Sequence, residues 1–234
     1  MVRMIVIRML RKLIPVLLAT ATLAMAHTVT GRDADFVRNS TGTHIAPFLY
    51  LGAKHMVTGY DHLLFLVGVI FFLYKLKDVA VYVTCFAVGH SITLLGGVLG
   101  GIHVNSYIVD ALIGLSVVYK AFDNLDGFRT LFGFQINTKA AVLGFGLIHG
   151  FGLATKLQEF NLSREGLVAN MISFNVGVEI GQLLALTVIL FVMTQWRRTA
   201  DFGKHAVLAN VLLMTAGFLL IGYQLSGYAF GSAA

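Results

Sequence analysis

Long apolar stretches separated by short polar ones dominate the pattern of this sequence. Beyond residue 43, six stretches are long enough to cross about 30 Å of hydrocarbon, which takes near 20 helical residues. They cover residues 46–76, 79–99, 107–121, 138–156, 167–196 and 206–228. The first is interrupted at Gly59, which predicts either two helical pieces or one kinked helix. The pattern therefore predicts an all-α, polytopic transmembrane helix bundle of six spans that forms one domain, residues 44–234.

The N-terminus has the three parts of a secretory signal peptide. Residues 3–12 are basic, residues 13–23 are apolar, and Ala24-Met25-Ala26 has the form of a cleavage site. Cleavage there makes His27 the first mature residue, and an uncleaved anchor helix is the alternative. We therefore expect residues 1–26 to be removed and residues 27–43 to form a polar tail on the exported side.

Composition supports a membrane protein and excludes several soluble classes. Of the 234 residues, 57% are hydrophobic and 12% are charged, whereas about 25% are charged in a soluble domain. The net charge of +6 would suggest nucleic-acid binding, but four of the 17 basic residues lie within the first twelve and the remainder nearly balances the 11 acidic ones. Nucleic acid is therefore not an expected partner. The single cysteine, Cys85, allows no intramolecular disulfide and no thiolate metal cluster.

Lys and Arg in the loops predict the orientation of the chain. With the polar tail outside, the cytoplasmic loops carry eight basic residues and the exported side carries four. The eight are Lys75, Lys77, Lys120, Arg129, Lys139, Arg197, Arg198 and Lys204, and the four are Arg32, Arg38, Lys156 and Arg164. This asymmetry agrees with the signal peptide and places both termini outside a bacterial inner membrane.

Ionisable side chains inside the spans are the informative ones, because each costs about 2.5–3.5 kcal/mol to insert and usually faces a partner or a cavity. They are His55, Asp61 and His62 in the first span, His90 in the second, Asp110 in the third, His149 in the fourth and Glu179 in the fifth. Because successive spans alternate in direction, these residues converge on the outer half of the bilayer. Glu179 lies around the middle of the fifth span. Neutral imidazoles beside carboxylates suit a divalent metal such as nickel, cobalt, zinc or copper. We predict one metal site.

A structural role is the alternative for each of these residues. For Asp110, that role is to accept hydrogen bonds from a neighbouring helix. A single membrane histidine often joins two helices, and we expect this of His103 and His205, near span ends. Asn175 and Gln182 can join helices in the same way. The glycines between residues 144 and 152 are expected to allow close helix packing.

Four segments of the chain carry a resemblance to a known family. They are His55-Met-Val-Thr-Gly-Tyr-Asp61-His62, of the form H-x5-D-H; Phe86-Ala-Val-Gly-His90-Ser91; Phe145-Gly-Leu-Ile-His149-Gly-Phe-Gly; and Phe174-Asn-Val-Gly-Val-Glu179-Ile-Gly-Gln182. Over residues 44–225 the chain resembles the HupE/UreJ family, nickel permeases associated with hydrogenase and urease gene clusters. The resemblance implies a signal peptide, six mature spans, metal transport, and metal contacts at His55, Asp61, His62 and His90, with Asp110 less directly. Met56 stands where hydrogenase-linked members have Pro, which indicates a divergent branch.

These features together predict a permease for a divalent transition-metal cation, nickel foremost, rather than an enzyme. Its expected partners are the metal ion and the lipid bilayer, and a homo-oligomer is compatible with them. We expect capture by His55, Asp61 and His62, an inner ligand in His90, and charge compensation by Asp110 and Glu179. No Walker A motif is present, which argues against ATP-driven transport by this chain. The alternative is an intramembrane metal-dependent hydrolase with Glu179 as general base, and the scarcity of ionisable residues in the inner halves of the spans favours it.

Overall fold

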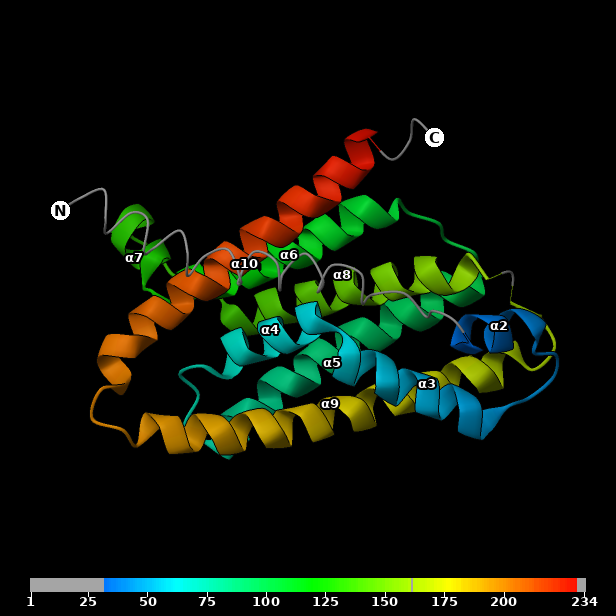
Figure 1. Ribbon diagram of the computed structural model, residues 1–234, viewed down its shortest axis with the longest axis horizontal. Helices are drawn as coiled ribbons and strands as arrows, with labels where there is room; N and C mark the ends of the chain where they lie inside the picture. The colour runs from blue at the N-terminus through cyan, green and yellow to red at the C-terminus, as the bar shows by residue number, and fades with distance from the viewer. Residues whose placement is uncertain (1–31, 161, 231–234) are drawn as a thin grey trace.

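The computed structural model describes residues 32–160 and 162–230, so the expected signal peptide and its cleavage site lie outside the described residues. Within this part every regular element is a helix (Figure 1). The helices are α2 (Arg32–Asn39), α3 (Ile45–Thr58), α4 (Tyr60–Ile70), α5 (Leu76–Gly100), α6 (Ser106–Asn124), α7 (Gly127–Phe132), α8 (Thr138–Gln158), α9 (Leu167–Arg197) and α10 (Phe202–Phe230). The all-α class predicted from the sequence is therefore confirmed.

Four of the described helices are long and apolar enough to cross a membrane by length and composition: α5, α8, α9 and α10. The first predicted span is divided into α3 and α4, of 14 and 11 residues, and α4 is a shorter apolar helix. The long helices run side by side with α6 in an elongated bundle (Figure 1). The chain is therefore a multi-pass membrane protein.

The break between α3 and α4 lies at Gly59, where the sequence predicted an interruption. The Gly59 backbone is extended, with φ −73° and ψ 100°, and its N–H donates to the His55 carbonyl at 2.8 Å to close α3. A Cβ atom at this position would lie 2.8 Å from Nδ1 of His62 and 3.3 Å from Oδ1 of Asp61. Glycine therefore allows the end of α3 and the start of α4 to approach each other closely, with His55 and His62 side by side.

The other end of α4 is held by Arg197, from the end of α9. Its guanidinium donates to the carbonyls of Phe71 at 2.8 Å and Leu73 at 2.9 Å, and also to that of Ile70. The last carbonyls of a helix lack partners within the helix and carry partial negative charge, so a cation there is favourable. The same guanidinium lies 4.8 Å from the ring centre of Tyr74.

Glycines allow three helix pairs to pack at short distance: α5 with α8, α3 with α9, and α6 with α10. A Cβ atom on Gly146 or Gly150 of α8 would overlap the backbone of α5, and one on Gly181 of α9 would lie 2.6 Å from a carbonyl oxygen of α3. The hydrophobic effect does not drive membrane helices together. Small residues let their backbones approach closely, and van der Waals contacts then stabilise the pair. The close-packing role expected of the glycines between 144 and 152 is confirmed at Gly146 and Gly150, whereas Gly144 faces open space.

Helix α2 occupies part of the segment that we expected to be a polar tail. Val37 is buried against the apolar core of the bundle, and Asp33 accepts a hydrogen bond from Lys54 of α3 at 2.5 Å. Arg38 lies over the ring of Phe160 at 5.4 Å. Residues 32–39 are therefore a helix that packs on one end of the bundle.

Candidate metal site

Four histidines from four different helices lie together in the middle of the bundle. His62 of α4 is central, with ring centres 5.1 Å from His55 of α3, 6.2 Å from His90 of α5 and 5.0 Å from His149 of α8. His62, His90 and His149 are almost fully buried, and His55 is partly buried. We call these four residues the histidine cluster.

The ring of His62 is oriented by its neighbour Asp61. Asp61 Oδ1 accepts hydrogen bonds from Nδ1 of His62 at 2.8 Å and from its backbone N–H at 2.7 Å. His149 is oriented similarly, because its Nδ1 donates to the Phe145 carbonyl at 2.7 Å. Donation by Nδ1 leaves the lone pair of a neutral imidazole on Nε2. A carboxylate or carbonyl behind the ring is also the usual support of a histidine that binds a metal.

Three of these rings have a buried nitrogen that nothing in the described residues satisfies. Nε2 of His55, His62 and His90 is shielded from water and has no hydrogen-bond partner there. A buried polar atom left without a partner costs about 1–3 kcal/mol, so three such atoms in one place require an explanation. A cation that accepts their lone pairs would remove that cost. No group of three or more His, Cys, Asp or Glu side chains in the described part is already arranged to hold an ion, so ligation requires side-chain movement.

Asp110 lies apart from the histidine cluster. Its carboxylate accepts hydrogen bonds from Lys156 of α8 at 2.7 and 3.0 Å, and from Gln224 of α10 at 3.3 Å. Both members of the ion pair are largely buried. The ammonium balances this carboxylate, and Asp110 accepts hydrogen bonds from two neighbouring helices, while its contact with a metal stays a prediction.

Glu179 also lies outside the histidine cluster, on the α5-facing side of α9. Its Oε1 is 3.5 Å from Nδ2 of Asn175, which also donates to the hydroxyl of Ser91 at 2.9 Å. These three residues and Gln182 line a cavity of about 510 Å³ between α5 and α9. Five of the seven residues predicted from the sequence are thus brought together, and Asp110 and Glu179 are placed elsewhere.

The sequence reasoning missed a polar group at the other end of α4. Lys120, which we counted as a loop charge, is buried and donates to Asp123 at 2.5 Å. Asn124 donates to the Gly68 carbonyl and to Oδ1 of Asn210, both at 2.9 Å. The spacing of Lys120 and Asp123, three residues apart on a helix, was the available signal.

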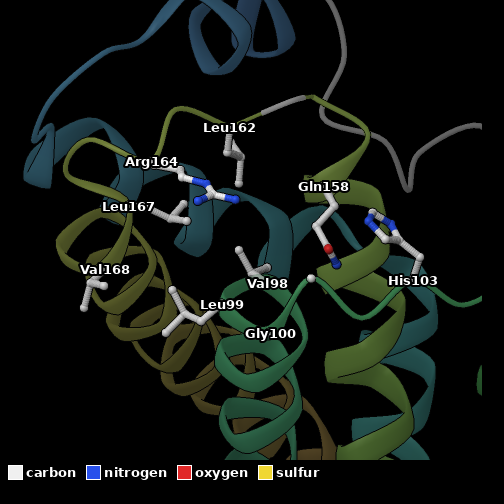
Figure 2. Close-up of a pocket in the computed structure, with 10 residues that line it drawn as sticks. Val98, Leu99, Gly100, His103, Gln158, Leu162, Arg164, Leu167 and Val168 are labelled. Atoms are coloured by element: carbon white, nitrogen blue, oxygen red, sulfur yellow. The ribbon is translucent and has the colours of Figure 1, made fainter.

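A wider cavity, of about 710 Å³, opens where α5 and α8 end and α9 begins. Figure 2 shows Arg164 and Leu167 on one side of it and Gln158 and His103 on the other. Val98, which also lines it, is about 12 Å beyond His90 along α5, at 1.5 Å per residue. We call this space the end cavity.

Comparison with known proteins agrees with the motifs of the sequence. The family model described as HupE / UreJ protein matches residues 31–232, from α2 to α10, and includes the whole histidine cluster. No curated protein and no solved structure matches the chain. Since the family match covers nearly the whole length, the chain belongs to the HupE/UreJ family.

Proposed function

We propose that the protein is a membrane permease for a divalent transition-metal cation, with nickel as the first candidate. Family membership indicates a membrane function related to nickel or cobalt transport. The observation that carries the proposal is the set of unpaired Nε2 atoms on His55, His62 and His90, gathered around one buried region. Imidazole nitrogen suits nickel, cobalt, zinc and copper, so the donor set fits this cargo.

The proposed topology has six spans, with α3 and α4 together forming the first and α6 the third. The 25 residues of α3 and α4 extend about 37 Å at 1.5 Å per residue, and the 19 residues of α6 about 28 Å. The loop charges favour both termini on the exported side of a bacterial inner membrane. A reporter fused to the C-terminus is then expected to behave as exported, and one placed near Arg198 as cytoplasmic. A cytoplasmic C-terminus would contradict the six-span count.

In this topology the cluster lies between the middle of the membrane and its exported side. His90 is about 21 Å from the start of α5, and His149 about 16 Å from the start of α8. A cation from the exported side would be bound by the histidine rings, while the Asp61 carboxylate behind His62 increases the electron density on the ligating nitrogen. The buried pair of Lys120 and Asp123 supplies polar groups near the inner end, which a route through the membrane needs.

The hydrolase considered from the sequence has no support in this geometry. The Ser91 hydroxyl accepts its hydrogen bond from Asn175 and lines the α5/α9 cavity, whereas the neighbouring His90 ring faces the cluster. Glu179 lines the same separate cavity, so it is not placed as a general base for a metal-bound water in the cluster.

Uptake of radiolabelled nickel, cobalt, zinc and copper into proteoliposomes tests the proposal. We expect the wild-type protein to accumulate nickel, and His62→Ala and His90→Ala each to abolish uptake while the protein still inserts and folds. His205→Ala is the matched control, because this histidine is exposed and distant from the cluster, and it should transport normally. Wild-type rates in both cluster variants would refute the site, and loss of insertion in both would assign these histidines a structural role.

A further inference from the structure

The cavity between α5 and α9 is lined by polar side chains among apolar ones. Asn175 is 8% exposed and Gln182 1%, and within the described residues neither Oδ1 of Asn175 nor Nε2 of Gln182 has a hydrogen-bond partner. Both side chains line the cavity, together with the carboxylate of Glu179. The side chain of Glu179 is exposed there, and because a carboxylate in contact with acyl chains is costly, water is the favourable filling beside it. The volume of about 510 Å³ holds more than ten waters, at about 30 Å³ each.

The α5/α9 cavity and the end cavity lie along the same two helices. On α5, Ile92 lines the first cavity and Leu99 the second; on α9, Asn175 lines the first and Val168 the second. Each pair is seven residues apart, which places its members on the same helical face about 10 Å from each other. The two cavities therefore follow the same helical faces, and the end cavity, drawn in Figure 2, lies at the exported end of the bundle in the proposed topology.

Two residues that line the α5/α9 cavity are chain neighbours of residues in or beside the histidine cluster. They are Asn175 and Ser91, joined by a hydrogen bond of 2.9 Å. Ser91 directly follows His90 in the chain, and Asn175 directly follows Phe174, whose ring centre lies 6.3 Å from that of His55. These two polar side chains therefore lie next to the cluster residues along both helices.

We infer, on the basis of the proposed function, that the α5/α9 cavity is the water-filled entrance for a hydrated divalent cation and that Glu179 is the carboxylate that attracts it. None of the described residues that line this cavity is basic, and its polar groups are mainly oxygen donors, which suit a cation that still carries its water. A carboxylate in a cleft with low-dielectric walls raises the local cation concentration and the association rate. The cation exchanges these oxygen contacts for imidazole nitrogen only at the cluster.

Thiol labelling tests whether the cavity holds water, independently of transport. In a Cys85→Ala background, which has no cysteine, Val88→Cys places a thiol in the cavity. Leu112→Cys on α6 is the control, since the two positions are 47% and 38% exposed and lie at similar distances, about 18 Å, from the inner ends of their helices. A membrane-impermeant reagent added from the exported side should modify Val88→Cys at least tenfold faster. Equal rates would overturn the inference.

Uptake kinetics test whether the cavity is the entrance. Glu179→Gln should raise the KM for nickel about tenfold with kcat within about twofold, because steering acts on association, and Glu179→Asp should restore the wild-type KM. Labelled Val88→Cys protein should lose uptake, and labelled Leu112→Cys protein should keep it. An unchanged KM in Glu179→Gln, or full uptake after labelling Val88→Cys, would overturn the entrance and leave the permease intact. Failure of the permease itself would appear instead as absent uptake in the wild-type protein.

Discussion

Replacing Gly150 by alanine tests the contact on which the position of α8 depends. A Cβ atom at this position would lie 3.0 Å from the carbonyl carbon of His90 and closer still to its oxygen, and it would also overlap the hydroxyl of Thr93. That hydroxyl donates to the Leu147 carbonyl of α8 at 2.7 Å, so it joins the same two helices. The backbone of α5 cannot turn aside as a flexible side chain would, and α8 must therefore move outward. Gly144→Ala on the same helix is the matched control, because nothing lies within 4 Å of its Cβ position.

The expected difference follows from three contributions. Both variants gain about 0.8–1 kcal/mol of helix propensity, which cancels in the comparison. Gly150→Ala then loses about 1–3 kcal/mol through overpacking and about 1 kcal/mol through the strained Thr93 hydrogen bond. We therefore expect its free energy of unfolding to be about 2–4 kcal/mol lower than that of Gly144→Ala.

Denaturant unfolding in mixed micelles measures this difference, and equilibrium nickel binding shows its effect on the cluster. Since His149 adjoins Gly150, outward movement of α8 should also weaken nickel binding at least tenfold, whereas Gly144→Ala should bind as the wild type does. Equal stability and equal binding in the two variants would show that α5 and α8 are not in contact at Gly150.

Three further substitutions test other contacts of the bundle. Asp61→Asn should lower nickel affinity about 10- to 100-fold, because the carboxylate orients His62; equilibrium dialysis measures this, and an unchanged affinity would contradict it. Lys156→Met should lower the free energy of unfolding by about 3–5 kcal/mol, because it leaves the Asp110 carboxylate buried without its ammonium. Denaturant unfolding should show that adding Asp110→Asn recovers most of this loss. Arg197→Met should lower the free energy of unfolding by about 2–3 kcal/mol, because it removes the hydrogen bonds to the Phe71 and Leu73 carbonyls. Arg198→Met, whose exposed side chain has no hydrogen bond to a described residue, should leave the melting temperature in micelles unchanged; equal melting temperatures in the two variants would refute the role of Arg197.

Local patterns were sufficient to predict much of the helical architecture. Apolar runs of adequate length identify α5, α8, α9 and α10, and a glycine between His55 and Asp61 indicated the break between α3 and α4. The end of α4 was not predictable, because the sequence continues to be apolar to Leu76 while the helix ends at Ile70. At that end the Ile70 carbonyl accepts a hydrogen bond from a guanidinium 127 residues later in the chain, which no local pattern could reveal.

The candidate site shows the same division between local and distant information. The cost of an ionisable group in lipid identified all seven residues, but it could not distinguish a group that faces a cavity from one that already has a partner. Asp110 has its ammonium from Lys156, 46 residues away, and nothing near Asp110 in the chain signals it. Glu179 shares a polar face of α9 with Asn175 and Gln182, but which neighbour that face meets depends on how α9 packs, and Gly177 and Gly181 direct the other face to α3.

The attachment of Arg197 makes α4 a mechanical link between the histidine cluster and the C-terminal end of α9. The helix is a rod of 11 residues, about 16 Å long, with His62 near one end and the Arg197 contacts at the other. At the His62 end the rod is joined to α3 through a single extended residue, Gly59, whereas at the far end it is fastened to α9. A displacement of the His62 end of α4 is therefore transmitted along the helix to the end that Arg197 binds. Any displacement of His62 therefore also acts on the C-terminal end of α9 and on the turn that leads into α10.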